Sequence, residues 1–291
     1  MSRPLDRRAV ALAALVALAG LGSLAAAPAD TARTAASAPA FRHGDVVPFT
    51  IPGRHQGRAR HGWVYTPPGY AAGRDTSLGL VLAFDGAEYL DEVPLPRVLD
   101  SLYAAGRIPP LVAVLLDDST SATRLDDLAN RAWFVAFLSD ELLPWVRKTW
   151  RVTHDPRRVI VTGSSAGGLA AAHVALRRPE LFGNVLSQSG AYWRGAEASN
   201  APPWEWLTAQ VAGWPRGDVR FWLEVGSTES RGALGGSAPS ILAANRAFRD
   251  ALKAKGYHVT YVEVPNGVHA PQTWAVRLPT GLAALAAPSP R

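Results

Sequence analysis

The sequence predicts an α/β fold in which a mostly parallel, doubly wound sheet carries helices on both faces. Apolar runs rich in β-branched residues and without a polar face recur at 78–84, 111–116, 159–162 and 219–225, as expected of strands buried on both sides. Helix-like segments alternate with these runs, which favours parallel strands joined by helical crossovers. The length of 291 residues suits one large domain with a sizeable core.

The remaining elements follow in order along the chain. Two strand-like runs at 46–51 and 58–65 are separated by Pro52-Gly53, which predicts an antiparallel pair at the start of the sheet. Polar or irregular composition predicts loops at 119–130 and 191–214. The other predicted elements are strands at 182–187 and 258–264 and helices at 95–105, 132–150, 241–255 and about 273–286.

The N-terminus has the pattern of a secretory signal. Arg3, Arg7 and Arg8 give a basic start, an apolar run covers 9–27, and Ala27-Pro28-Ala29 fits a small-x-small cleavage site. The paired arginines also allow twin-arginine export. The alternative is a membrane anchor, but the run is Ala-rich and near the lower length limit for spanning a bilayer.

The predicted organisation is therefore a signal peptide at 1–29, a disordered Ala/Thr/Ser-rich linker at 30–40, and a single α/β domain at 41–291. We expect a secreted or periplasmic protein without stable membrane insertion once the signal is removed. That removal takes away three Arg and one Asp, and it lowers the formal net charge from +6 to +4.

Composition excludes several function classes. The chain has no cysteine, so disulfides, thiolate nucleophiles and thiolate zinc sites are excluded. The mild positive charge comes without a run of Lys and Arg interleaved with aromatic residues, so no nucleic-acid partner is expected. No metal or organic cofactor is expected either, and the sequence does not predict an oligomeric state.

Residues 158–175 read RVIVTGSSAGGLAAAHVA and predict a strand, a sharp turn and a helix. The turn carries Gly-x-Ser-x-Gly, which in this context is the nucleophile elbow of a serine hydrolase. Gly163 and Gly167 lack the Cβ atoms that would clash in such a turn, and Ser165 is the predicted nucleophile. The N–H of Ala166, at the start of the helix, is the predicted oxyanion donor. The alternative interpretation is an ordinary Gly/Ser-rich turn.

Three histidines follow Ser165 along the chain. His173 lies about two turns along the elbow helix, and His258 opens a strand at the wrong end of the sheet. His269 lies in a Gly-containing loop just past a strand end, which is where the base of such a hydrolase belongs. We therefore expect His269 to be the base, against the alternative of a solvated loop residue.

Glu229 is the predicted acid of the triad. Eight carboxylates lie between the nucleophile and the base, and Glu229 alone lies in a loop just past a strand end. Glu224 is the alternative, although it lies inside the strand. The second oxyanion donor is expected from the loop that follows the strand at 78–84, at the N–H of Gly86 or of Ala87; an ordinary turn is the alternative there.

The run 161–193 and the segments LAFDGAEYL, DELLPWVRKTW, LEVGSTES and NGVHAPQTW resemble enterochelin (ferric enterobactin) esterases. The wider family also contains esterase D-type S-formylglutathione hydrolase, feruloyl and acetylxylan esterases, and the mycolyltransferases. LSQSGAYW and RLDDLAN point to the enterochelin-esterase branch. The resemblance implies an α/β-hydrolase fold, the triad Ser165, Glu229 and His269, and an arginine near Arg124 that faces an anionic substrate.

Two kinds of side chain are candidates for binding the substrate. Arg124 could hold a catecholate or carboxylate through paired N–H donors, or it could be a surface arginine paired with Asp126 or Asp127. Indole rings could stack on aromatic acyl groups, or they could pack a cap and the last helix against the core. The tryptophans in question are Trp193, Trp204, Trp206 and Trp274.

The sequence thus predicts an exported serine esterase that works through an acyl-enzyme on a small-molecule or oligomeric ester. Bulky aromatic esters, with siderophore trilactones first, are the expected substrates. A feruloyl or acetylxylan esterase acting on carbohydrate is the alternative, and an acyltransferase of the mycolyltransferase type is another. A non-catalytic binding protein on a hydrolase scaffold is the alternative from a different functional class.

Overall fold

The computed structural model describes residues 43–54, 57–70, 78–117 and 121–287. The predicted signal peptide and linker lie outside these described residues. Within the described ranges, no helix combines the length and apolar character needed to cross a membrane.

The core of the fold is a mixed sheet of eight strands in the described residues, in the order β1-β2-β4-β3-β5-β6-β7-β8. The strands from β4 to β8 in this order pair in parallel, whereas β2 pairs antiparallel with both β1 and β4. The predicted antiparallel start and parallel remainder are confirmed. The strands are β1 (Asp45–Pro52), β2 (Ala59–Thr66), β3 (Gly79–Phe84), β4 (Leu111–Asp117), β5 (Val159–Ser164), β6 (Asn184–Gln188), β7 (Arg220–Gly226) and β8 (His258–Val264).

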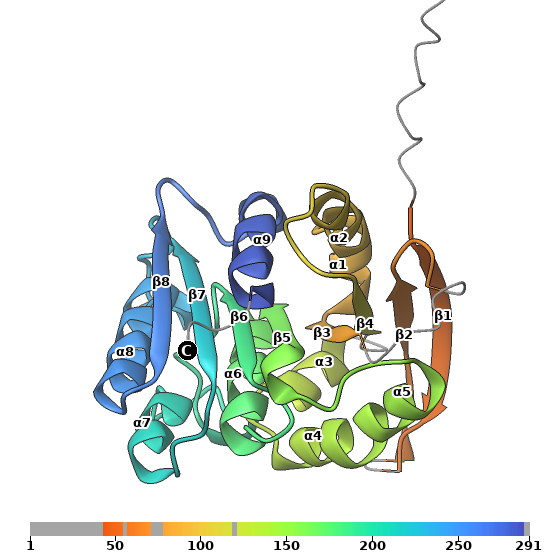
Figure 1. The fold of residues 1–291 in the computed structure, drawn as a ribbon. Coiled ribbons are helices and arrows are strands. Elements are labelled where there is room, and N and C mark those ends of the chain that lie inside the picture. Colours follow the sequence, from red (N-terminus) through yellow and green to blue (C-terminus); the bar gives the residue numbers. More distant parts are fainter. Residues whose placement is uncertain (1–42, 55–56, 71–77, 118–120, 288–291) are drawn as a thin grey trace, which may run out of the picture. The chain divides into compact units, whose positions relative to one another are not determined.

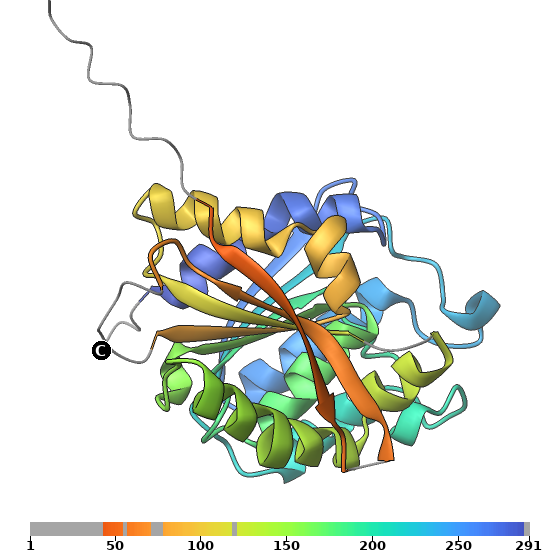
Figure 2. The same ribbon diagram turned by 90° about the vertical axis from the view of Figure 1, so that its right-hand side faces the viewer.

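Helices cover both faces of the sheet, as predicted (Figure 1). One face carries α1 (Gly86–Asp91), α2 (Leu95–Ala104) and α9 (Pro271–Ala286), seen above the twisted strands in Figure 2. The other face carries α3 (Ser121–Leu128), α4 (Ala132–Phe137), α5 (Leu143–Thr149), α6 (Ala166–Arg177), α7 (Trp206–Gly213) and α8 (Ile241–Ala254).

Two hydrophobic cores follow from the two-residue period of the strands. In β3, Leu80, Leu82 and Phe84 belong to the core under α4 to α8, whereas Val81 and Ala83 belong to the core under α1, α2 and α9. All five are almost completely buried. A strand buried on both faces needs apolar side chains at every position, which explains why this run has no polar face in the sequence.

The segment predicted as one helix at 132–150 is interrupted. It forms α4, a five-residue π-helix at Leu138–Leu142, and α5. Pro144 lies in the first turn of α5 and has no N–H to donate to the carbonyl one turn earlier. The wider π turn before it accommodates the ring, which is a common cause of such local widening.

Three segments predicted as loops contain helices instead. The loop predicted after the strand at 78–84 is replaced by α1, the loop predicted at 119–130 contains α3, and the irregular segment at 191–214 contains α7. These helices are six to eight residues long, so they are too short to be stable by local propensity alone. They depend on tertiary contacts, which cannot be predicted from hydrophobic periodicity in the sequence.

Candidate active site

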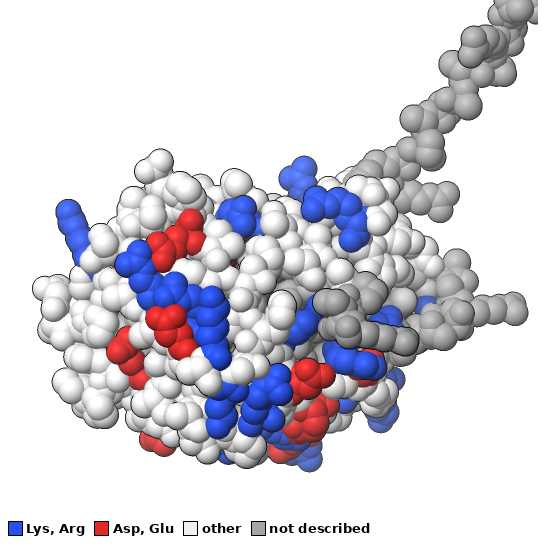
Figure 3. Space-filling view, turned by 60° about the vertical axis from the view of Figure 1, so that its left-hand side comes forward, with Lys and Arg blue, Asp and Glu red and all other residues white. Residues whose placement is uncertain are grey.

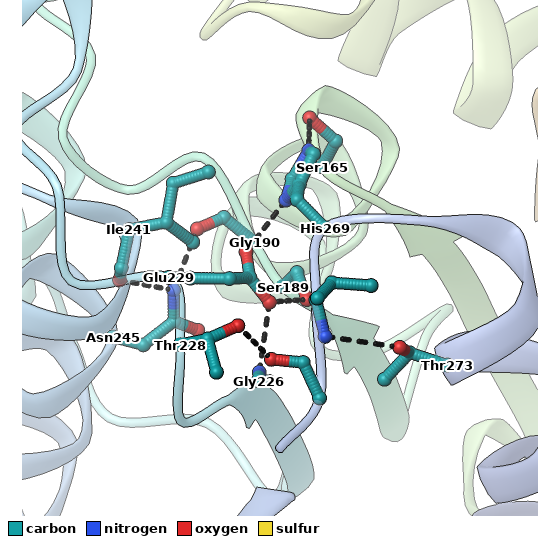
Figure 4. Close-up of polar contacts among 12 residues, drawn as sticks. Ser165, Ser189, Gly190, Gly226, Thr228, Glu229, Ile241, Asn245, His269 and Thr273 are labelled. Carbon is teal, nitrogen blue, oxygen red and sulfur yellow. Dashed lines mark hydrogen bonds and ion pairs between the residues drawn. The ribbon is translucent and has the colours of Figure 1, made fainter.

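The candidate catalytic side chains meet beyond the carboxyl ends of the parallel strands. Ser165 follows β5, Glu229 follows β7 and His269 follows β8. His269 lies between the other two side chains, as Figure 4 shows: its Nε2 is 3.0 Å from the hydroxyl of Ser165, and its Nδ1 is 2.6 Å from Oε2 of Glu229. These distances are hydrogen bonds, and the arrangement has the geometry of a nucleophile, a base and an orienting acid.

The turn at Ser165 is strained in the way that an exposed nucleophile requires. Its φ of 53° and ψ of −116° are rare for a residue with a side chain. A Cβ at Gly163 would lie only 2.5 Å from the carbonyl carbon of Gly167, so the strand and the helix can approach this closely only with glycine there. The backbone of Ser165 is held on both sides, because its N–H donates to Gln188 O at 2.9 Å and its carbonyl accepts from Ala191 N at 2.9 Å.

The loops that carry the acid and the base are tied together. The N–H and the hydroxyl of Thr228 both donate to the carbonyl of Gly267, at 3.2 and 2.5 Å. The N–H of Asn266 donates to the Ser227 hydroxyl at 3.0 Å. A Cβ at Gly226 would lie 2.3 Å from the Gly267 carbonyl oxygen, so glycine permits this close approach. The separation between acid and base is therefore fixed by backbone contacts as well as by their own hydrogen bond.

Glu229 is deeply buried and fully engaged, since its side chain is only 3% exposed. Its Oε1 accepts from the Ser189 hydroxyl at 2.7 Å and from the Gly226 N–H at 2.8 Å. The indole N–H of Trp274 donates to the same Ser189 hydroxyl at 3.0 Å. The Trp274 ring also meets His269 edge-on, with 5.2 Å between ring centroids.

Glu224, the alternative acid, takes part in a different network. Its Oε1 accepts from Gln188 at 2.9 Å and its Oε2 accepts from Arg277 at 3.2 Å. Burial raises the pKa of this carboxyl above its usual range. Glu224 therefore joins β6, β7 and α9 underneath the site and makes no contact of this kind with His269. In the described ranges, no cluster of three or more His, Asp or Glu could hold a metal ion.

The two backbone N–H groups expected to bind an oxyanion both lie at helix starts. Ala166 begins α6 and Gly86 begins α1, so neither N–H has an acceptor within its own helix. The N–H of Ala87 instead donates to the Asp117 carboxylate at 3.0 Å. Of the two candidates in this segment, the geometry favours Gly86.

Arg124 makes a different ion pair from the one considered at the sequence level. It forms a bidentate pair with Asp85, through Nε to Oδ1 and through Nη2 to Oδ2 at 2.7 Å, rather than with Asp126 or Asp127. A Cβ at Gly167 would lie 3.0 Å from the Asp85 carboxylate, so the pair lies against the first turn of the elbow helix. The Arg124 side chain keeps 29% of its surface exposed.

A second arginine, which sequence reasoning missed, lies near Arg124. Arg194 is buried and stacks on the ring of Trp193, with the guanidinium carbon 4.8 Å from the ring centroid. Its pKa is lowered, first by burial and then by the positive charge of Arg124. The two guanidinium groups thus lie close enough to influence each other, and the Asp85 carboxylate offsets the charge of Arg124.

Of the tryptophans considered for stacking or packing, Trp193 and Trp274 are packed into the core. Trp193 is 6% and Trp274 is 5% exposed, which leaves little ring surface for a substrate. Trp206 lies elsewhere, edge-on to His173, and Trp214 stacks on the same imidazole. Burial lowers the pKa of His173 to about 3, so this histidine is a neutral core residue.

A family model described as "Putative esterase" matches residues 54–285. The chain belongs to this esterase family. Together with the enterobactin esterases among its relatives and structural neighbours, this match confirms the resemblance to enterochelin esterases and the α/β-hydrolase fold. The N-terminal strand β1 lies outside the matched region.

Several relatives of this family member are enterobactin esterases. The iron(III) enterobactin esterase of Escherichia coli strain K12 is 31% identical over 77% of this chain, which covers 53% of that protein. The Dickeya dadantii enzyme is 37% identical over 45% of this chain, which covers 30% of it. The chain thus spans about half or less of the length of these relatives.

Solved structures of enterobactin esterases are also similar to this chain. The enterobactin esterase of Shigella flexneri, crystallised in the presence of enterobactin, superposes with a TM-score of 0.73 and 28% identity, over 83% of this chain and 58% of that one. A ferulic acid esterase superposes with a TM-score of 0.67 over 84% of this chain and 98% of its own, but at 16% identity. The second match shows a shared fold only.

The surface of this esterase-family chain carries both signs of charge. Figure 3 shows basic and acidic side chains next to one another on the face that it presents. Among the described pairs, Arg246 and Glu263 join α8 to β8 through two hydrogen bonds of 2.7 Å. Such exposed pairs contribute little to stability.

Proposed function

We propose that this chain hydrolyses carboxylic esters through an acyl-enzyme, with Ser165 as nucleophile, His269 as base and Glu229 as orienting acid. The observation that carries the proposal is the continuous pair of hydrogen bonds from the Ser165 hydroxyl through the imidazole to the buried carboxylate, at 3.0 and 2.6 Å. A serine hydroxyl is a weak nucleophile unless a base removes its proton as it attacks. The base is only useful in the tautomer that leaves Nε2 free, and Glu229 selects it by accepting from Nδ1.

Attack forms a tetrahedral intermediate whose oxygen carries the developing negative charge. The N–H groups of Ala166 and Gly86 stabilise that charge, helped by the positive end of α6. Because these donors belong to the backbone of helix termini, they need no rearrangement when the charge develops. His269 then gives its proton to the leaving alcohol, and the acyl group remains on Ser165.

Water completes the cycle by the same route. The His269 side chain is 35% exposed, so solvent can reach the imidazole after the alcohol leaves. The imidazole takes a proton from the incoming water, and the same two N–H groups hold the second oxyanion. Regeneration of the Ser165 hydroxyl releases the acid product.

For the substrate we propose a bulky aromatic ester with acidic groups, of the siderophore trilactone type. Arg124 and Arg194 supply two guanidinium groups beside the elbow whose N–H donors suit a catecholate or carboxylate. The relatives that are described as iron(III) enterobactin esterases agree with this choice. The buried rings of Trp193 and Trp274 take no direct part in it.

A carbohydrate esterase of the feruloyl type is the second candidate. The motivating observation is an endo-1,4-beta-xylanase/feruloyl esterase of Xylanibacter ruminicola, which is 26% identical over 48% of this chain. A ferulate ester has an aromatic acyl group but lacks the trilactone. An acyltransferase would use the same acyl-enzyme and pass the acyl group to a sugar rather than to water.

The test is an ester panel run on the protein beside its Ser165→Ala variant. We expect the wild-type protein to hydrolyse enterobactin with a higher kcat/KM than feruloylated arabinoxylan, and Ser165→Ala to be inactive but folded. Labelling by a fluorophosphonate at Ser165 checks the nucleophile directly. Hydrolysis by the Ser165→Ala variant at the wild-type rate refutes the proposed function, and a preference for the feruloyl ester selects the second candidate.

We further propose that the chain is exported, on the basis of the basic, apolar and small-x-small pattern of residues 1–29. Mass spectrometry of the mature N-terminus and fractionation of the producing cell test this. A mature chain that begins after residue 29 in the extracytoplasmic fraction is expected. An uncut chain in the cytoplasm contradicts it.

A further inference from the structure

Ser189 has a backbone conformation that is unusual for serine. It follows β6 directly, is 1% exposed, and has a φ of 49°, in the left-handed region that favours glycine. The next residue is Gly190, so the chain has a glycine at this bend but not at the strained position. A serine held there against its conformational preference points to a use for its hydroxyl.

That hydroxyl has a definite direction. A serine hydroxyl can donate one hydrogen bond and accept two, whereas an indole N–H can only donate. Trp274 Nε1 lies 3.0 Å from the Ser189 hydroxyl, and the hydroxyl lies 2.7 Å from Oε1 of Glu229. Trp274 must therefore be the donor to Ser189, and the single Ser189 proton is left for Glu229.

These hydrogen bonds fix the orientation of the Glu229 carboxylate plane. Oε1 has two donors, the Ser189 hydroxyl and the Gly226 N–H, while Oε2 faces His269. A carboxylate held at one oxygen only by a backbone N–H could turn about its terminal bond, whose torsional preference is broad. Two donors from different directions restrict this rotation and keep Oε2 aimed at Nδ1 of the imidazole.

We propose that Ser189, with its hydroxyl oriented by the indole N–H of Trp274, is a positioning residue that aims Glu229 at His269. The inference rests on the proposed function, because positioning matters only if Glu229 orients the base. Neither Ser189 nor Trp274 touches the substrate in this role. Both act on kcat through Glu229, whose alignment with the base must hold within a few tenths of an ångström for efficient proton transfer.

The experiment compares Ser189→Ala and Ser189→Gly with wild type on a p-nitrophenyl ester. Both variants lose the hydroxyl, but glycine also relieves the strain of the positive φ, so a variant that folds well is available. We expect both to lower kcat about 10- to 100-fold and to leave KM within about twofold, since a hydrogen bond to a charged group is lost without a change at the substrate. Ser187→Ala is the matched control: this buried serine of β6 bonds to Tyr192 at 2.7 Å, and its loss should leave kcat within about twofold.

Trp274→Phe tests the direction of the relay, because it removes the N–H and keeps an aromatic ring beside His269. On the wild-type background we expect kcat to fall about three- to tenfold, and on the Ser189→Ala background no further fall. If the ring acted only by packing on His269, the same factor would be lost on both backgrounds, and the relay would be overturned. It is also overturned if Ser189→Ala and Ser189→Gly both keep kcat within about twofold of wild type.

The proposed function is tested separately with the same proteins. Fluorophosphonate labelling at Ser165 in wild type, with loss of labelling in Ser165→Ala, establishes the nucleophile whatever the Ser189 variants do. Slow but complete labelling of the Ser189 variants, to one equivalent, is the expected result for a positioning residue. Turnover by Ser165→Ala would overturn the proposed function, and the inference about Ser189 with it.

Discussion

Replacement of Glu229 by glutamine should select the wrong tautomer of His269. Glutamine has nearly the shape of glutamate, but one of its two terminal atoms is an NH₂ group that donates and does not accept. The position of Oε1 receives two donors, from Ser189 and Gly226 at 2.7 and 2.8 Å. The amide oxygen must therefore occupy this position, and the NH₂ group then faces Nδ1 of His269.

The size of the effect follows from those contacts. An NH₂ group that points at Nδ1 stabilises the tautomer with a proton on Nε2, which cannot take the proton of Ser165. Reversal of the amide to recover the useful tautomer would leave two buried donors without acceptors, at about 1–3 kcal/mol each. At about 1.4 kcal/mol per factor of ten, the total of about 2–6 kcal/mol lowers kcat/KM by about 30-fold to 10⁴-fold.

The assay is kcat/KM for a p-nitrophenyl ester between pH 6 and pH 9, with thermal unfolding to check that the variant is folded. Glu224→Gln is the matched comparison, since Glu224 is similarly buried but bonds to Gln188 and Arg277 instead of the base. We expect Glu224→Gln to lower the melting temperature and to keep kcat/KM within about threefold. Wild-type activity of Glu229→Gln, or an equal loss in Glu224→Gln, would show that the assignment of the acid is wrong.

Three further results are expected. Burial lowers the pKa of His173 to about 3, so its contribution to stability is present above pH 6.5 and is lost as pH falls from 6.5 towards 3. In urea titrations, His173→Phe should reduce the difference in unfolding free energy between pH 7 and pH 4 by about 3 kcal/mol. An unchanged difference would contradict this expectation. Gly163→Ala places a Cβ 2.5 Å from the Gly167 backbone, so thermal unfolding should show a loss of about 1–3 kcal/mol together with lost activity, and wild-type stability would refute the close approach. Arg124→Gln should raise KM about tenfold for an aromatic ester that carries a free carboxylate, and less than about threefold for the same substrate with that carboxylate methylated. Equal increases for the two substrates would show that Arg124 acts mainly through its ion pair with Asp85.

The sequence predicted the parts of this fold that local patterns encode. The buried strands are apolar at every position, the elbow has a spacing imposed by its own backbone strain, and both can be read from consecutive residues. The placement of Glu229 and His269 followed from a general property of parallel sheets, whose carboxyl ends meet at one edge. The sequence could not show that His269 lies within 3.0 Å of Ser165, because this distance depends on how two loops pack.

The wrong prediction of a loop at 119–130 has a physical cause. The helix α3 was predicted as a loop because it is short and polar, yet Arg124 pairs with Asp85 and Asp127 pairs with Arg58 and Arg60. Each of these pairs joins residues separated by 39 or more positions, so no window of the sequence contains both partners. Such ion pairs outweigh local propensity, and they change the interpretation of an arginine from a surface residue to one anchored beside the elbow.

The role inferred for Ser189 could be recognised only once its backbone conformation was known. Gln-Ser-Gly was visible as the exit of a strand at the edge where reacting groups gather, but an exit serine has many ordinary uses. The backbone conformation makes the difference: a φ of 49° is unfavourable for serine and acceptable for the glycine that follows it. The nucleophile Ser165 also has a positive φ, of 53°, and at both serines the hydroxyl makes a hydrogen bond within the site. One attacks the ester, and the other holds the carboxylate that directs the base.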